Sequence, residues 1–333
     1  MPDVAHIEVP VPYLGSVNVW LLRGEPLTLI DTGPLNEHAF AALEQQLGGH
    51  GVAIEDLELV LITHHHLDHS GLAARIKERS GAQIAAHRGT ALWGRSYHER
   101  AAQEHRFTLE LIQAHGVPEH VVSGSWSFFD YIVRESANFE TDRVLRDGDT
   151  IRAGDRTLRV VFRPGHSTTD TLFVDELSRD AFVGDHLLAT ITSGAELVPT
   201  ELPGDERRRA LLDYLSNLRK TGAMELATCY SGHGPTIDEH RTLIDERMAF
   251  HAARLDLIKQ YVEEGCATAF DIARRLWSDE VAETQTVLAI WEVVGHLDIL
   301  VNRGTVMEQV DGSGHHYFRP RDAVAAAAAG RAP

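Results

Sequence analysis

The sequence contains only two cysteines, Cys229 and Cys266, and their separation does not match the short spacing of a metal-binding pair. This low count excludes a disulfide framework and is typical of a reducing compartment. No apolar run reaches roughly 18 residues, so no membrane span is expected. The N-terminal stretch also does not combine a basic start with an apolar segment, as a signal peptide would. These absences predict a cytoplasmic protein without a membrane partner.

Basic residues are scarce as well, because 31 Lys and Arg stand against 49 Asp and Glu, for a formal net charge of −18. A field of this sign repels nucleic acids and anionic membrane surfaces. A local basic pocket for an anionic substrate is still compatible with this charge. We therefore expect a small-molecule substrate and no nucleic-acid partner.

Short strand–loop–helix units recur along the chain, of which 43% is hydrophobic. Apolar runs end in turns, and each turn leads into residues with helical spacing. Repeated units of this kind predict a sheet core faced by helices, an α/β (α+β) architecture. Strands are expected at residues 17–22, 27–31, 57–63, 83–86, 144–162 and 171–175, and helices at residues 37–47, 71–80 and 206–220.

Residues 90–140 break this rhythm and predict helices joined by loops. We expect this insertion to pack over the site as a helical lid. It contains an aromatic cluster, which could line an acyl pocket for the substrate or form the insertion's own small core. The cluster consists of Trp126, Phe128, Phe129 and Tyr131.

The last part of the chain has the pattern of a winged-helix-like domain, in which helices are followed by a β-hairpin. The helices are expected at residues 237–264, 269–276 and 284–303, and the hairpin around residues 311–314.

The expected division is therefore a first domain at residues 1–250, a winged-helix-like domain at residues 251–320 and a low-complexity tail at residues 321–333. Residues 251–320 contain six Lys and Arg but eleven Asp and Glu, whereas a domain that reads nucleic acid should be basic. Its longest helix is apolar and acidic, which favours packing or homodimer formation through the C-terminal domain.

The densest chemical signal is the stretch LITHHHLDHSG, which begins at residue 61, and its histidine cluster directly follows the apolar strand expected at residues 57–63. Neutral imidazole and carboxylate groups are good ligands for zinc and other divalent metals. In an extended segment alternate residues point the same way, so His64 and His66 can converge on one ion. Asp68 and His69 can turn toward a second ion.

Four residues cannot complete two metal sites, but three later turns offer further ligands. His166 lies in PGHS, Asp185 in VGDH and His233 in SGHG, each at the end of an expected strand. His186, next to Asp185, could support the site, line the pocket or lie on the surface. Cys229 is expected to be a buried core thiol.

With these motifs, the sequence resembles the metallo-β-lactamase-fold hydrolase superfamily, whose signature is H-x-H-x-D-H followed by a distant His, Asp and His. The resemblance spans residues 6–250 and implies a four-layer αββα sandwich with a dinuclear site along one edge of two sheets. True β-lactamases of this family often use a cysteine as a metal ligand. Asp185 occupies the corresponding position here, as in the glyoxalase II-like branch.

The resemblance implies two groups of three metal ligands and one bridging ligand. The first group is His64, His66 and His166, the second is Asp68, His69 and His233, and the bridge is Asp185. Asp31, in LIDTG, matches an early aspartate of the family that orients the ligands from behind. His65 falls at a variable position and is not expected to be a ligand. Two Zn²⁺ ions are expected, although iron or manganese can occupy such a site.

The implied reaction is metal-assisted hydrolysis by a hydroxide that bridges two metals. Asp68 would orient this hydroxide, and Asp185 would hold both metals. Thioesters or related activated esters, of the acyl-CoA or glutathione type, are the favoured substrates. Lactones come next, then RNA, then β-lactams, since secreted resistance enzymes need a signal peptide.

Two alternatives come from other relatives of this family. Some members with a winged-helix-like tail are endoribonucleases or phosphodiesterases, but the acidic tail of this chain argues against that activity. Iron-dependent persulfide dioxygenases use a single metal, whereas all seven ligand positions are filled here. The sequence therefore favours hydrolysis.

Overall fold

The computed structural model of the chain describes residues 3–12, 15–124, 126–200 and 207–321, and for residues 126–128 only the backbone is described. The chain forms two compact units. The first contains Met1–Ala101, Asp130–Ser193 and Ser216–Ile244, and the second contains Ala102–Phe129, Gly194–Leu215 and Asp245–Pro333.

A six-stranded sheet opens the first unit, with its strands in chain order. Its strands are β1 (Val4–Val11), β2 (Gly15–Leu22), β3 (Thr28–Ile30), β4 (Leu59–Ile62), β5 (Gln83–His87) and β6 (Arg143–Leu145). Strands β1 to β3 pair antiparallel, and β3 to β6 pair parallel. All four residues of β4 are buried, as expected for a parallel strand covered on both faces. Strand β1 was not predicted, although its inward-facing residues alternate with more exposed ones.

The second sheet has five strands in the order β11-β10-β9-β8-β7. They are β7 (Thr150–Ala153), β8 (Arg156–Phe162), β9 (Thr171–Asp175), β10 (Ala181–Gly184) and β11 (Cys229–Ser231). Strands β10 and β11 pair parallel, and the other neighbours pair antiparallel. Parallel pairing places the ends of β10 and β11 at the same edge of the sheet.

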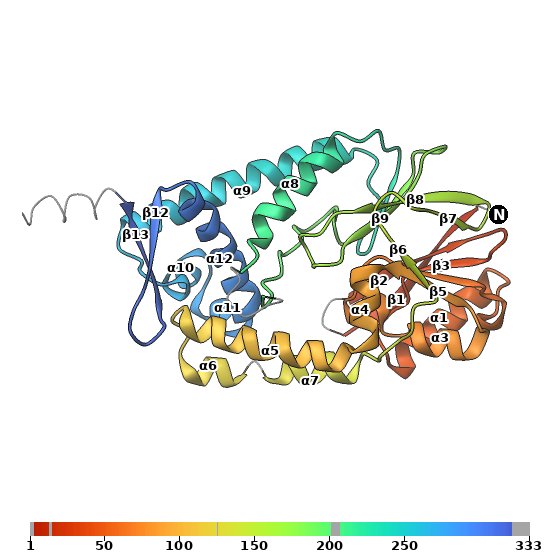
Figure 1. Cartoon of the computed structure of the whole chain (residues 1–333), viewed down its shortest axis with the longest axis horizontal. Coiled ribbons are helices and arrows are strands. Elements are labelled where there is room, and N and C mark those ends of the chain that lie inside the picture. Colours follow the sequence, from red (N-terminus) through yellow and green to blue (C-terminus); the bar gives the residue numbers. More distant parts are fainter. Residues whose placement is uncertain (1–2, 13–14, 125, 201–206, 322–333) are drawn as a thin grey trace, which may run out of the picture. The chain divides into compact units, whose positions relative to one another are not determined.

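Two apolar cores hold these layers together. One core lies between the sheets and contains Trp20 and Leu61 from the first sheet with Val160, Phe173 and Phe182 from the second. The other core lies between the first sheet and helices α1 (Glu37–Gly49) and α3 (Ala73–Ser80), which cover its outer face (Figure 1).

The part of helix α8 (Ala210–Gly222) that belongs to the first unit adjoins the second sheet, and helix α9 (His240–Glu263) begins in the first unit. In α8, Thr221 hydrogen-bonds His186, which follows β10, and Asn217 hydrogen-bonds the loop after β8. The predicted mixed α/β sandwich is confirmed.

The predicted insertion is helical. It forms α4 (Arg88–Arg95), α5 (Tyr97–Ala114), α6 (Glu119–Gly124) and α7 (Trp126–Arg134). Residues 102–129 of this segment belong to the second unit, and the remainder belongs to the first. Its role as a lid stays a prediction.

The second unit contains most of α9, then α10 (Ala269–Leu276), α11 (Asp279–Thr284), α12 (Thr286–Asn302) and a hairpin of β12 (Val306–Val310) and β13 (His316–Pro320). This order of helices and hairpin is the predicted one, whereas the winged-helix-like assignment and the homodimer stay predictions. Of the predicted tail at residues 321–333, residues 322–333 lie outside the described residues.

The second unit also includes residues 102–129 and 194–215, which the predicted division placed in the first domain. Helix α12 explains this difference. It is apolar and largely buried, so more of its surface packs against other segments than a small three-helix domain could cover. Arg207 donates to both carboxylate oxygens of Asp298, at 2.7 and 2.9 Å. Leu211 packs so closely on α12 that a Cβ on Gly295 would lie 3.0 Å from its Cβ.

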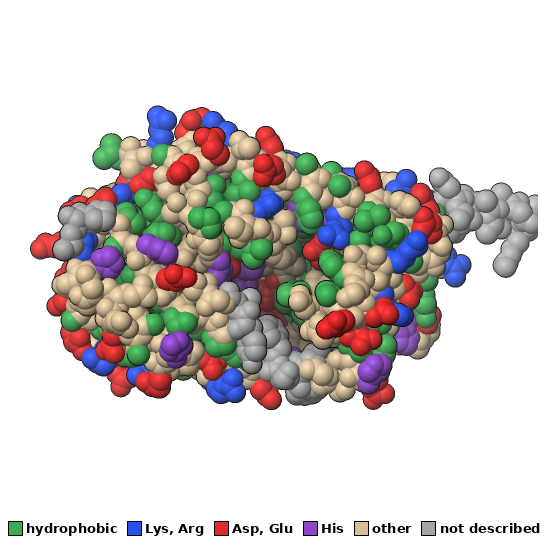
Figure 2. Space-filling view, turned by 180° about the vertical axis from the view of Figure 1, so that it is seen from behind, with side chains coloured by type: hydrophobic (Ala, Val, Ile, Leu, Met, Phe, Trp, Pro, Cys, Tyr) green, Lys and Arg blue, Asp and Glu red, His purple; other side chains and the backbone are tan. Residues whose placement is uncertain are grey.

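The surface reflects the composition. Acidic side chains are spread over the face seen in Figure 2, and Lys and Arg side chains lie among them, in keeping with the net charge of −18. Among the described residues, no helix combines the length and the apolar character needed to cross a bilayer.

Candidate metal centre

The predicted ligands follow the ends of four strands in the first unit. The histidine-rich loop begins right after β4, and its last part forms the short helix α2 (Leu67–Ser70). The hydroxyl of Ser70 donates to the carbonyls of His65 and His66 and so closes the loop on itself. The remaining ligands follow β8, β10 and β11. These ends meet because the two sheets pack face to face.

One group consists of three imidazoles. The Nδ1 atom of His66 lies 3.1 Å from Nε2 of His64 and 3.1 Å from Nε2 of His166. Tetrahedral zinc with Zn–N bonds of about 2.0–2.1 Å places ligand nitrogens about 3.3–3.4 Å apart. These three nitrogens are therefore spaced as the ligands of one metal ion would be.

A second group combines a carboxylate with two imidazoles. The Oδ2 atom of Asp68 lies 3.2 Å from Nε2 of His233 and 3.8 Å from Nε2 of His69. The three residues offer donor atoms close enough together to hold one ion.

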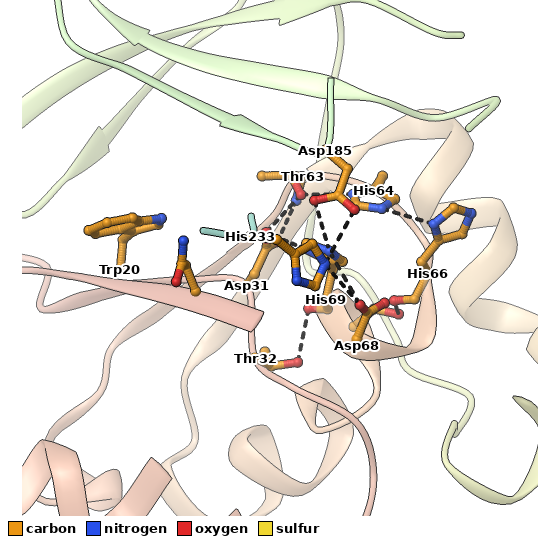
Figure 3. A network of polar contacts seen from close by, with 12 residues as sticks. Trp20, Asp31, Thr32, Thr63, His64, His66, Asp68, His69, Asp185 and His233 are labelled. Atoms are coloured by element: carbon orange, nitrogen blue, oxygen red, sulfur yellow. Dashed lines mark hydrogen bonds and ion pairs between the residues drawn. The ribbon is translucent and has the colours of Figure 1, made fainter. Parts of the chain in front are cut away.

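Asp185 lies between the two groups (Figure 3). Its Oδ1 atom is 3.4 Å from Nε2 of His69, and its Oδ2 atom is 3.4 Å from Nε2 of His233. The same Oδ2 atom is 3.7 Å from Nε2 of His166 in the other group. One carboxylate thus faces ligands of both groups, as a bridging ligand must.

Two orphaned atoms show that this donor set fits metal ions. Nε2 of His69 and Oδ1 of Asp185 are buried, and apart from facing each other at 3.4 Å neither makes a hydrogen bond among the described residues. A buried polar atom without a partner costs free energy comparable to a lost hydrogen bond. Because both atoms face the centre of the cluster, a bound cation would satisfy them.

The pKa shifts within the cluster also favour the binding of cations. Burial acts to raise the pKa of Asp68, but His69 and His233 outweigh it and lower the pKa to about 2. Burial acts to lower the pKa of His233, but Asp185 and Asp68 outweigh it and raise the pKa to about 10. The buried carboxylates thus stabilise positive charge on the neighbouring imidazoles. A bound metal ion would supply this charge in place of the protons.

Asp31 fixes the protonation of two imidazoles from behind. The Nδ1–H of His69 donates to its Oδ2 atom at 2.8 Å, which leaves Nε2 with a free lone pair. Thr63 donates its hydroxyl to the same oxygen and its amide to Oδ1, each at 2.8 Å. Since that hydroxyl is already a donor, it accepts from Nδ1 of His64 at 3.0 Å. Both histidines therefore turn a lone pair toward the site.

Asp31 has a left-handed backbone, with φ of 61°. Asparagine tolerates this region, so Asp31→Asn should keep the backbone while weakening the acceptor for His69. We expect the affinity for zinc to fall about 10–100-fold, the usual cost of losing such a partner. A competition titration with a chromogenic zinc chelator measures this change.

The matched control is Arg179→Asn, since Arg179 also has a positive φ, of 64°, in the turn before β10. This variant should keep the affinity of the original protein. Unchanged affinity in Asp31→Asn would contradict the role assigned to Asp31.

Three residues close to the predicted ligands in sequence, His65, His186 and Cys229, were not predicted to be ligands themselves. His65 is buried, its ring stacks on Trp93 at 3.9 Å, and its Nδ1 contacts the Thr169 hydroxyl at 2.9 Å. The surface interpretation of His186 is wrong, because the residue is fully buried and contacts Thr221. The buried core thiol is confirmed for Cys229, which is fully buried, and burial raises the pKa of this thiol to about 12.

The candidate pocket residues do not form one described group. Tyr131 is buried in the first unit. Phe129 belongs to the second unit, where its ring stacks on His105 at 4.2 Å. The side chains of Trp126 and Phe128 lie outside the described residues. An acyl pocket lined by these aromatics stays a prediction.

Several contributors were not predicted from the sequence. Thr63 precedes the motif and could have been suspected only from its position between a buried strand and a ligand. Asp170 accepts from the amide and hydroxyl of Ser167 at 2.8 and 2.7 Å and so closes the turn that carries His166. The Ser-x-x-Asp spacing of such a turn was a usable signal. Asn18 in β2 and Asn217 in α8, which hydrogen-bond the loops of His233 and His166, gave no such signal.

This fold and this cluster agree with the comparison to known families. The chain belongs to the metallo-beta-lactamase superfamily, whose family model matches residues 12–233. The matched segment reaches from the first strands to the last predicted ligand, His233.

One curated relative extends the match over most of the chain, and another covers half of it. "Probable metallo-hydrolase YqjP" from Bacillus subtilis (strain 168) is 29% identical over 318 residues, which cover 93% of this chain and 96% of the relative. "Acyl-coenzyme A thioesterase MBLAC2" from Homo sapiens is 29% identical over 175 residues, covering 50% of this chain and 57% of the relative.

Solved structures agree with the fold. The metallo-beta-lactamase family protein TTHA1429 from Thermus thermophilus superposes with a TM-score of 0.78 at 26% identity, covering 96% of this chain and 99% of the other. A beta-lactamase domain protein from Burkholderia ambifaria gives a TM-score of 0.82 at 25% identity, covering 96% and 93%. The family of metallo-hydrolases is thus established for this chain.

Proposed function

We propose that this protein is a dinuclear metal-dependent hydrolase that cleaves thioesters or related activated esters of the acyl-CoA or glutathione type. The observation that carries the dinuclear part is the position of Asp185. Its carboxylate lies within 3.7 Å of imidazoles from both ligand groups. We assign two Zn²⁺ ions to these groups.

The chain's own residues have distinct tasks in this proposal. Divalent metals bound there would supply Lewis acidity and lower the pKa of water toward about 7. Asp68, with its pKa of about 2, stays ionised at neutral pH and can accept a hydrogen bond from a reacting water. Asp31 and Thr63 keep the lone pairs of His69 and His64 directed at the site. No serine or cysteine nucleophile is required.

Two kinds of relative support thioesters as the substrate class. The human thioesterase named above is one. The other is "Atrochrysone carboxyl ACP thioesterase AgnL7" from Paecilomyces divaricatus, which is 30% identical over 189 residues, covering 55% of this chain and 54% of the relative. The chain spans about half the length of both thioesterases. They share hydrolysis of an acyl thioester, which is why we place thioesters ahead of lactones, RNA and β-lactams.

The decisive test is a substrate panel on one metal-loaded sample, with the metal content of that sample measured by elemental analysis. The panel contains acyl-CoA thioesters of short and long chain, a glutathione thioester, a lactone, a single-stranded RNA and a chromogenic β-lactam. We expect two zinc ions per chain and turnover of at least one thioester.

An oxygen ester with the same acyl group serves as the matched substrate control, and it should react more slowly than its thioester. Cleavage of lactone or RNA with inert thioesters would overturn the assigned substrate class. A single iron ion without hydrolysis would overturn the dinuclear hydrolase itself.

A further inference from the structure

Two buried asparagines, Asn18 and Asn217, each hydrogen-bond the backbone of one loop that carries a histidine of the cluster. We propose that each asparagine is a positioning residue for one metal site: Asn18 sets the affinity of the site that contains His233, and Asn217 sets that of the site that contains His166. This inference rests on the proposed two-metal centre.

Asn18 lies in β2 of the first sheet, whereas the His233 loop follows β11 of the second sheet. Its side-chain amide donates to the carbonyl of Ser231 at 3.0 Å and to that of Gly234 at 2.7 Å, on either side of the histidine. Its backbone amide donates to the carbonyl of Gly232 at 2.7 Å. Three bonds from one residue thus hold three carbonyls of a four-residue turn.

The same strand also orients the imidazole. Nδ1–H of His233 donates to the carbonyl of Ser16 at 2.6 Å, which leaves Nε2 directed at Asp68 and Asp185. Asn18 is 3% exposed, so its amide is largely shielded from competing water. If the amide is lost, the loop keeps only part of its ties to the first sheet.

Asn217 performs the corresponding task at the other loop. It lies in α8 and donates its side-chain amide to the carbonyl of Pro164 at 2.6 Å, two residues before His166. Its side chain is 6% exposed. Since proline lacks an amide proton, this loop has fewer backbone bonds of its own and depends more on the asparagine.

In both asparagines, a neighbouring hydrogen-bond donor fixes the orientation of the side-chain amide. An asparagine side chain can rotate to exchange its oxygen and nitrogen, and only one orientation donates to the loop. Nε2–H of His6 donates to Oδ1 of Asn18 at 2.7 Å, and Nζ of Lys220 donates to Oδ1 of Asn217 at 2.9 Å. In both cases a neighbouring donor occupies the oxygen and leaves the NH₂ group facing the loop.

The experiment compares Asn18→Ala, Asn217→Ala and Asn138→Ala by zinc titration against a chromogenic chelator that resolves two binding steps. Asn138 is the control, because its side chain also bonds the backbone, here by accepting from the amide of Tyr97 at 2.8 Å, and makes no hydrogen bond to a ligand loop within the described part of the chain. We expect Asn18→Ala to weaken one step and Asn217→Ala the other, each by about 10–100-fold. Asn138→Ala should leave both steps unchanged. Thermal melting of each variant verifies folding.

Single-site backgrounds assign the steps to the sites. In a His66→Ala background, Asn18→Ala should weaken the remaining zinc and Asn217→Ala should not. In a His233→Ala background, the pattern should reverse. Equal weakening of both steps by each variant, or none, would overturn the inference.

The readout is binding of zinc alone, so it is independent of the substrate. Selective weakening together with inert thioesters would support the inference and contradict only the proposed substrate. A parent protein that binds a single zinc would overturn both the inference and the dinuclear proposal.

Discussion

Asp185→Asn is expected to abolish stable binding of both metal ions, because this carboxylate faces both ligand groups. The substitution keeps the shape of the side chain but replaces an anionic oxygen with a neutral amide. A lost outer partner alone costs about 10–100-fold, so loss of the bridge should lower kcat/KM by more than about 100-fold. Elemental analysis and thioester kinetics on one sample measure both effects.

Asp175→Asn is the matched control. Asp175 is as buried as Asp185, at 7% exposure, and ends the neighbouring strand β9 at the opposite edge of the sheet. It pairs with Arg156, so its replacement should lower the melting temperature but leave two metals bound. Full activity and two metals in Asp185→Asn would refute the bridge.

Gly232→Ala should be nearly as damaging, for a steric reason. A Cβ at this position would collide with Oδ1 of Asp185 and would lie 2.6 Å from Cε1 of His69. Both neighbours are ligands held by other contacts, so the methyl group must displace the His233 turn. We expect loss of at least one metal, a fall in kcat/KM of more than about 100-fold and a stability loss of about 1–3 kcal/mol. Metal analysis, kinetics and urea unfolding test this expectation.

Gly48→Ala supplies the comparison. Gly48 lies in α1, and nothing lies within 4 Å of its would-be Cβ. Alanine in an exposed helix should stabilise the protein by about 0.5–1 kcal/mol and leave both metals in place. If Gly232→Ala behaved like Gly48→Ala, the close packing of the turn against Asp185 would be disproved.

The candidate ligands could be predicted from the sequence because each is a polar residue that follows a buried strand, as with His64 after β4 and Asp185 after β10. Such positions can be recognised from a few neighbouring residues of the sequence. Parallel and antiparallel pairing then determine that the ends meet. The mixed α/β sandwich was predictable for the same reason, since apolar runs and glycine turns repeat along the first part of the chain.

The residues that support the ligands were not predictable in this way. Asn18 acts on a loop more than 200 residues away, with a sequence separation of 213 to Ser231. Nothing in the local pattern of β2 distinguishes it from an ordinary polar residue of a strand. The composition of the second unit was missed for a similar reason. The apolar sequence of α12 shows that this helix must be buried. The segments that pack against it are distant in the chain, so the sequence does not identify them.

The predicted ligands come from both sheets, and this affects how long the folded protein would persist in a cell. Neither sheet alone can assemble either complete ligand set, so an unfolded chain offers no comparable site. Any ion that binds only the folded state stabilises it by an amount that grows with the logarithm of the ion's free concentration. In the proposed metal centre, the supply of metal would therefore affect how long each molecule survives degradation as well as how fast it works.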